Sequence, residues 1–270
     1  MWNIWYSEWR MTIRQRSSYM LVLLWVGVLS LIFLLERNTP ALTGYTNMTG
    51  TIANLVLYIV PLFMLISGSF TIANEMENGQ WRLLCTYPLS TSSYLIGKLA
   101  GQFTAQAVVF TLSFGTSLAV GLISGSVLSV KWVLALYIFA ISLIFFFLVI
   151  GLALGVFVAT RWQALTLSVG VWFFLIMIWP SALIAILGLV PYPMIVPLLK
   201  IALFCNPAEL LRIVFVVQLG GGAVFGQSYD GLVTFLQKGA AWGILGLYVF
   251  IYTSFLFILS AWKLERRKVQ

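Results

Sequence analysis

The chain has 270 residues, of which 61% are hydrophobic and 8% are charged. Soluble domains carry about 25% charged residues, so this composition, with a mean hydropathy of +1.03, excludes an ordinary soluble protein and indicates a membrane protein. The net charge is +8, and basic residues in a membrane protein fix its topology in an anionic bilayer. No segment resembles a nucleic-acid-binding module, so nucleic acid is not an expected partner.

The pattern of residues 1–18 predicts an amphipathic helix that lies in the membrane interface. Trp2, Trp5 and Trp9 recur at helical spacing and form an aromatic stripe on one face. The basic residues Arg10 and Arg14 fall on other faces. Indole rings favour the level of the lipid headgroups. A plain cytoplasmic tail is the alternative. The apolar run that follows has no small-residue cleavage site, so we do not expect a signal peptide.

Six later segments are apolar enough to span a bilayer, which requires about 20 residues. They are residues 19–35, 52–73, 99–124, 132–160, 164–190 and 239–262. Pro180 lies inside the fifth segment and predicts a kink there. We therefore expect an all-α integral membrane protein of about six transmembrane helices, with residues 19–270 as one transmembrane domain.

The basic residues orient these spans. With both termini in the cytoplasm, ten Lys and Arg residues fall on the cytoplasmic side and five on the other. This distribution agrees with the tendency of cytoplasmic loops to be basic. We therefore expect a multi-pass protein of the cytoplasmic membrane with both ends in the cytoplasm.

Residues 190–238 break this regular pattern. Prolines and a run of glycines divide the segment into pieces that are too short to span the membrane comfortably. Asn206, Pro207 and Glu209 form a helix-start signal, and Arg212 follows one turn later. We expect short re-entrant or interfacial helices on the outer face. A seventh and an eighth span would also keep the C-terminus inside and remain the alternative.

The residues that catalysis or ion coupling would need are missing from the sequence. There is no histidine, the commonest general base and metal ligand. Cys85 and Cys205 fall on opposite sides without a CxxC partner, so no metal or redox motif is present. Ionisable residues are absent from the span centres, and no phosphate-binding loop is present. We expect no enzyme and no bound cofactor or metal.

Two features of the predicted spans each allow two interpretations. Polar residues on the second span either line a cargo path or make hydrogen bonds between helices; they are Asn54, Ser67, Ser69 and Thr71. Glycine pairs such as Gly151 and Gly155 have the spacing of close helix contacts. Such contacts occur within one chain or between two copies, and packing within the chain is the simpler interpretation.

Residues 74–98, between the second and third spans, are the most distinctive part of the sequence. Their charged, turn-forming and apolar positions are Glu75, Glu77, Gly79, Leu83, Leu84, Pro88, Ser90, Gly97 and Lys98. Clustered charge, a glycine turn, an apolar patch and a proline stop suit a short cytoplasmic helix presented to a soluble partner. An ordinary solvated loop is the alternative.

This pattern resembles the permease subunits of ABC-2-type ABC transporters. In that family the loop forms coupling helices that dock on the ATPase, so the resemblance implies an ATPase-coupling role for Glu75, Glu77, Gly79, Leu83, Leu84 and Pro88. Residues 1–18 resemble the family's elbow helix. The run from Asn206 to Arg212 resembles a further family feature on the outer side.

The resemblance implies a permease subunit that couples ATP hydrolysis to export or to movement of an extracytoplasmic partner. A separate ATP-binding cassette ATPase would bind ATP and Mg²⁺, and a second permease copy would complete a homodimer. More narrowly, residues 83–98 resemble permeases that assist copper-site assembly in nitrous-oxide reductase, together with an ATPase and a periplasmic accessory protein. A mechanotransmission or scaffold subunit that moves no cargo itself is the alternative.

Overall fold

The computed structural model describes residues 2–35, 45–86, 90–125, 129–225, 229–237 and 240–268. These residues form helices and turns without a β-strand. In chain order the helices are α1 (Trp2–Arg14), α2 (Arg16–Leu35), α3 (Asn47–Glu77), α4 (Gln80–Cys85), α5 (Thr91–Ile123), α6 (Val130–Phe157), α7 (Arg161–Trp172), η2 (Phe173–Ile178), α8 (Trp179–Leu189), α9 (Tyr192–Cys205), α10 (Pro207–Gln218), η3 (Gly222–Phe225), α11 (Asp230–Leu236) and α12 (Ala240–Lys268).

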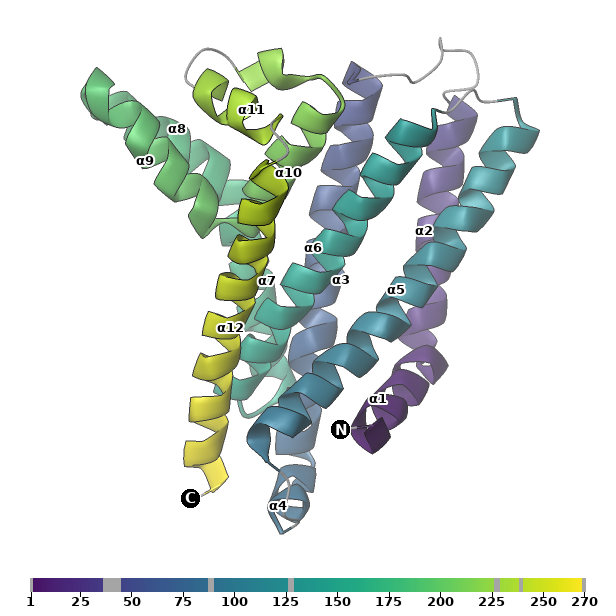
Figure 1. The fold of residues 1–270 in the computed structure, drawn as a ribbon. Coiled ribbons are helices and arrows are strands. Elements are labelled where there is room, and N and C mark those ends of the chain that lie inside the picture. The colour runs from purple at the N-terminus through teal and green to yellow at the C-terminus, as the bar shows by residue number, and fades with distance from the viewer. Residues whose placement is uncertain are drawn as a thin grey trace.

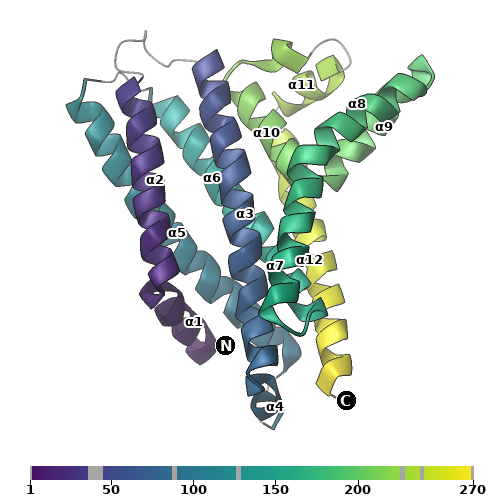
Figure 2. The ribbon, with the colours of Figure 1, turned by 180° about the vertical axis from the view of Figure 1, so that it is seen from behind.

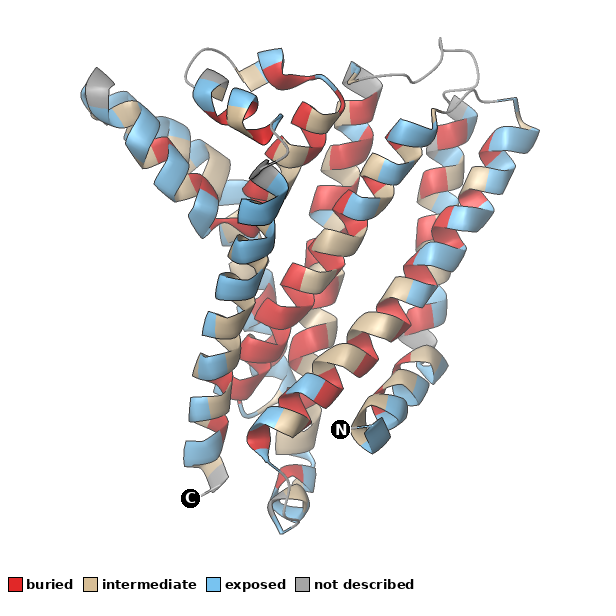
Figure 3. Ribbon diagram, viewed as in Figure 1, coloured by how far each residue is buried: buried red, intermediate tan, exposed pale blue. Residues whose placement is uncertain are grey.

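The long helices run side by side between two ends of the bundle (Figures 1 and 2). One end carries α1, α4 and both chain termini, and we call it the α4 end. The opposite end carries α11 and is called the α11 end. Helices α3 and α6 pack along each other at the centre, while α1 and α2 pack on α5. Burial is densest on α3 and α6, whereas the described residues of α8 include no buried one and those of α12 only Ser260 and Leu264 (Figure 3).

Five helices are long and apolar enough to cross a membrane: Thr49–Glu77, Thr91–Ile123, Val130–Phe157, Arg161–Leu189 and Trp242–Arg267. They match the second to the sixth predicted spans. The first predicted span corresponds to α2, whose apolar part, Ser18–Leu31, is shorter. A sixth candidate is the pair Met194–Cys205 and Pro207–Gln218, which bends by 107°. The structure therefore confirms an all-α membrane protein.

Helices at the α4 end continue beyond the predicted spans. Helix α3 extends to Glu77, and α5 begins at Thr91 because the Ser90 hydroxyl accepts a hydrogen bond from the Ser93 amide at 3.3 Å. Residues 74–98, expected as a loop, are therefore mostly helical. Hydropathy marks where the apolar surface ends, whereas a capping residue determines where the helix itself begins.

Glycines allow α3 and α6 to approach closely. A Cβ atom added to Gly68 would lie 2.9 Å from the Leu148 carbonyl oxygen, and one added to Gly155 would lie 2.6 Å from the Ser69 carbonyl oxygen. Gly151 is equally close to α3. The glycine spacing noted in the sequence thus serves packing within the chain.

Three of the four polar residues considered on α3, Ser67, Ser69 and Thr71, are engaged in hydrogen bonds between helices. The Gln102 amide of α5 donates to the Ser67 hydroxyl at 2.8 Å and to the Thr71 hydroxyl at 2.9 Å. The Ser69 hydroxyl is 2.8 Å from that of Ser168 on α7. Of the two interpretations of these residues, the structure supports hydrogen bonding between helices.

The kink expected at Pro180 is a π-helical turn, η2, between α7 and α8. In the π register the Trp179 amide donates to the Phe174 carbonyl. The next donor in that register would be the nitrogen of Pro180, which carries no hydrogen. The Leu175 carbonyl therefore lacks a partner within its own helix.

Candidate functional site

A buried ion cluster joins three helices at the α4 end. The Lys98 side chain of α5 is only 2% exposed, and its Nζ lies 2.5 Å from Glu8 Oε1 of α1 and 2.7 Å from Glu75 Oε1 of α3. The Tyr94 hydroxyl donates a hydrogen bond to Glu75 Oε2. We call Glu8, Glu75, Tyr94 and Lys98 the ion cluster. It links the N-terminal helix directly to the segment that the sequence marked as distinctive.

The ion cluster carries two carboxylates for one ammonium group, so one negative charge is in excess when both acids are ionised. Burial raises the pKa of Glu8, and the neighbouring Lys98 opposes that shift. Charged groups removed from water are stable only when they are paired closely. The cluster therefore holds α1 in one position against α5.

Helix α1 approaches α5 through a contact that only glycine permits. A Cβ atom at Gly101 of α5 would lie 2.6 Å from the Trp5 carbonyl oxygen and 2.7 Å from Glu8 Cβ. The face of α1 turned toward α5 carries Glu8 and Thr12, both buried. The sequence located the helix, but Glu8 as its anchoring residue was missed. The only signal was a single acid in an otherwise basic helix.

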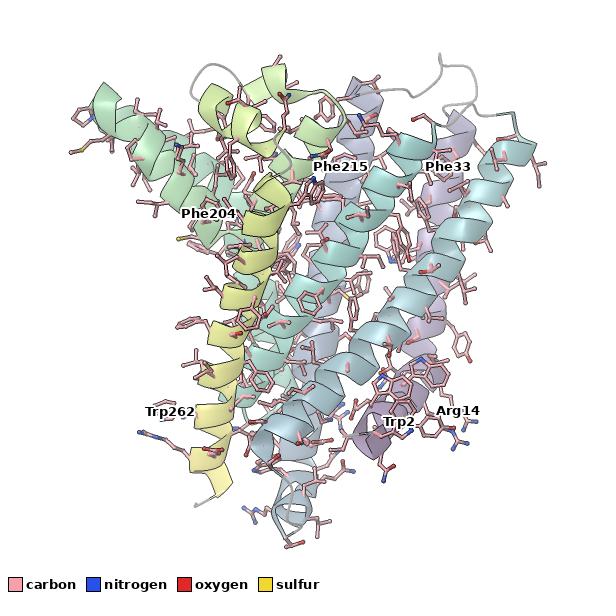
Figure 4. All side chains as sticks on the ribbon, viewed as in Figure 1. Trp2, Arg14, Phe33, Phe204, Phe215 and Trp262 are labelled. Carbon is pink, nitrogen blue, oxygen red and sulfur yellow. The ribbon has the colours of Figure 1, made fainter. Side chains whose placement is uncertain are left out.

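The aromatic stripe of α1 lies beside this contact. Neighbouring rings touch, with centroids 4.7 Å apart for Trp2 and Trp5 and 6.2 Å apart for Trp5 and Trp9. Trp2, Arg10 and Arg14 are exposed, and Trp2 and Arg14 mark the two ends of α1 at the edge of the bundle (Figure 4). The helix ends at Arg14, four residues before the expected boundary, and α2 begins at Arg16.

Helix α4 is a short projection that one glycine makes possible. Gly79 has φ = 72°, a left-handed conformation that reverses the chain after α3. Trp81 is buried with its ring 5.3 Å from that of Tyr94, and Leu84 packs beside them. Leu83, by contrast, is 67% exposed. Leu84 therefore anchors α4 to the bundle, while Leu83 faces outward. Pro88 lies outside the described residues.

The second acid of the predicted coupling segment forms a different link. Glu77 Oε2 accepts a hydrogen bond from the Arg161 amide at 2.8 Å and lies 3.4 Å from Arg161 Nε. This contact joins the end of α3 to the start of α7. Glu75 and Glu77 are therefore both engaged within the chain, and the exposed side chains that follow them include Asn78, Gln80, Arg82 and Leu83.

The motif in residues 190–238 lies at the bend between α9 and α10. Asn206 is fully buried and caps α10, since its Oδ1 accepts a hydrogen bond from the Ala208 amide at 3.0 Å. Its Nδ2 donates to the Leu175 carbonyl at 2.7 Å. This hydrogen bond satisfies the carbonyl that Pro180 leaves without a partner in η2.

The remaining motif residues follow in the first two turns of α10. Pro207 occupies its start, and Glu209 Oε2 lies 2.8 Å from Arg212 Nη2. The helix start was thus predicted from the sequence. The Leu175 partner was not, because it lies 31 residues earlier in the chain and is a backbone atom.

Comparison with known proteins agrees with this arrangement. The family model described as ABC-2 family transporter protein matches residues 2–220. The chain is 28% identical over 253 residues to the probable ABC transporter permease protein NosY of Stutzerimonas stutzeri, covering 91% of this chain and 86% of that protein. It is 29% identical over 194 residues to the protein of the same name from Pseudomonas aeruginosa, covering 67% and 70%. The chain therefore belongs to the ABC-2 transporter family and is a multi-pass membrane permease.

Proposed function

We propose that this permease works with a separate ATP-binding cassette ATPase, which binds at the α4 end. The observation that carries the proposal is the construction of α4. Its Leu83 is 67% exposed, while its base is tied to α1 and α5 through Trp81, Tyr94 and the ion cluster. A projection held at its base, with Arg82 and Leu83 exposed, has the form of the coupling helices that the family resemblance implies. The α4 end would then face the cytoplasm, as the basic residues favour.

Movement of the ATPase would reach several helices through named contacts. A push on α4 would pass through the Gly79 turn to α3, through the ion cluster to α1 and α5, and through Glu77 and Arg161 to α7. These links make the α4 end respond as one body. Rigid-body movement of this kind is a common form of transport-coupled change.

We further propose that a second copy packs against α7 and α8. The most apolar part of this 29-residue span is only 6% buried. Beside it lies a groove of about 820 Å³, lined by Trp162, Leu167, Val171 and Phe174 among others. A second copy would cover this apolar face, as the resemblance to homodimeric permeases implies.

ATP hydrolysis by the partner subunit would drive either export of a cargo or movement of an extracytoplasmic partner on the opposite side of the membrane. One observation favours the second of these, a mechanotransmission subunit that moves no cargo itself. Ser67, Ser69 and Thr71 are all engaged between helices, rather than lining a path. The chain is similar to NosY-named permeases, and residues 83–98 resemble permeases of nitrous-oxide-reductase maturation. The role proposed on that resemblance is copper-site maturation of this enzyme, with a periplasmic accessory protein as the moved partner.

Purification from the native membrane tests the ATPase proposal. We expect an ATP-hydrolysing subunit to accompany the wild-type chain and to be lost with Leu83→Asp. Val130→Asp is the matched control, because Val130 is 74% exposed in the first turn of α6 at the other end. Loss of the ATPase with both variants, or with neither, would contradict docking at α4.

A further inference from the structure

A slot runs between α6, α10 and α12 near the α11 end. Helices α10 and α12 both pack on α6 but hardly on each other. The space between them forms a cavity of about 440 Å³, within the range of roughly 300–1,000 Å³ that is usual for ligand sites. We call this cavity the α6 slot.

The chemistry of the α6 slot changes along its length. Its polar end is formed by Lys131 and Trp242, in the first turns of α6 and α12, and by Gln218, in the last turn of α10. Farther from the α11 end the lining is mostly apolar and includes Phe139 and Phe146. Phe215 of α10 extends this apolar wall toward α6, with its ring stacked 4.9 Å from that of Phe139 (Figure 4).

The dimensions of the α6 slot match one leaflet of a bilayer. Phe146 lies fifteen positions after Lys131 in α6, a rise of about 22 Å along the helix. Half of the hydrocarbon core is roughly 15 Å thick, which leaves several ångströms for a headgroup. A Trp side chain at the polar end is typical of the interface between headgroups and acyl chains.

Lys131 supplies the charge that selects the occupant. It is exposed at the mouth of the slot and makes no ion pair within the described part of the chain. We propose that the α6 slot binds a phospholipid with an anionic headgroup, placing its phosphate at Lys131 and one acyl chain along Phe139 and Phe146. The groove on α7, proposed for a second copy, shares no lining residue with this slot.

Native mass spectrometry of the purified chain, mixed with equal amounts of phosphatidylglycerol and phosphatidylcholine, tests the proposal. Gly246 lines the slot, and a Cβ atom there would meet nothing within 4 Å. Gly246→Phe should therefore fold and fill the slot. Gly243→Phe, on the same helix with equally open surroundings and outside the slot, is the control. We expect the phosphatidylglycerol adduct in the wild type and the control, and its loss in Gly246→Phe.

The headgroup contact is tested with a second pair of variants. Lys131→Gln should lower the preference for phosphatidylglycerol over phosphatidylcholine by about fivefold, the effect of one basic residue near an anionic surface. Lys200→Gln, an exposed lysine of α9 outside the slot, should leave it unchanged. Equal adducts in Gly246→Phe and Gly243→Phe would overturn the proposal, as would a wild type without headgroup preference. A change of oligomeric state specific to Gly246→Phe would assign the slot to a second copy instead.

Discussion

The two sides of the bundle bury their surfaces differently. In α3 and α6 about half of the most apolar window is buried, at 50% and 56%, whereas in α7–α8 and α12 the share is 6%. The first side is closed by interhelical hydrogen bonds, close glycine contacts and the ion cluster. The second side packs on the first through α7 and α12 but leaves a large apolar surface exposed. In a bilayer, packing, hydrogen bonds and small residues hold helices together, because lipid is as apolar as the side chains. The first side is therefore complete within one chain, and the second offers surfaces to lipid and to a second copy.

The largest expected loss of stability comes from removing the ammonium group of the ion cluster, on the side of the bundle that is complete within one chain. Lys98→Ala leaves Glu8 and Glu75 buried together without a positive charge. Breaking a buried ion pair in this way costs about 3–5 kcal/mol. We expect a large fall in the midpoint of thermal unfolding in detergent. Arg14→Ala, which removes an exposed charge from α1, should change the midpoint little, and an equal fall in both variants would show that Lys98 is not a structural anchor.

A smaller loss of stability is expected from removing the hydrogen bond that Asn206 donates to η2, on the side of the bundle with the large exposed apolar surface. Asn206→Ser keeps an uncharged oxygen of the kind that caps helices but removes the donor to the Leu175 carbonyl. An unsatisfied buried carbonyl costs about 1–3 kcal/mol. Pro180→Ala restores a backbone N–H to η2, so the same Asn206→Ser change should cost less in that background. A double-mutant cycle on unfolding free energies measures this coupling, and strictly additive effects would contradict the link.

The smallest expected effect is the pH dependence that Glu8 introduces. The pKa of Glu8 is raised by burial, so above the usual carboxyl range the folded protein binds more protons than the unfolded chain. Stability should therefore fall as pH rises through this window, by less than about 1.4 kcal/mol per pH unit, the value for one proton. Glu8→Gln should flatten the slope measured from about pH 5 to about pH 8. An unchanged slope would place the titration elsewhere.

Much of the fold followed from periodicity and length. Five predicted spans, the amphipathic N-terminal helix and the helix start at Asn206 were all found, because each depends on local composition or capping. Helix ends at the α4 end were less well placed, since polar helix extensions carry no hydropathy signal. The π-helical form of the kink was not predicted, nor was the side chain 31 residues away that bonds its Leu175 carbonyl.

The candidate site was predicted by segment, while its contacts were not. Residues 74–98 contribute Glu75, Tyr94 and Lys98 to the ion cluster, but the pairing with Glu8 spans 90 positions of the chain. The adjacent leucines likewise have opposite roles, with Leu84 packed inward and Leu83 exposed. A single sequence offers no means of telling which side of a six-residue helix will face its own chain.

Site-specific photo-crosslinking in native membranes tests docking at the α4 end most directly. A photoreactive phenylalanine analogue would replace Leu83 in one protein and Ile123 in another. Both residues are large, apolar and exposed, at 67% and 87%, and they lie at opposite ends of the bundle. We expect a covalent adduct with an ATP-binding subunit from position 83 alone. An adduct from position 123, or none from position 83 while the ATPase still co-purifies, would contradict docking of the ATPase on α4.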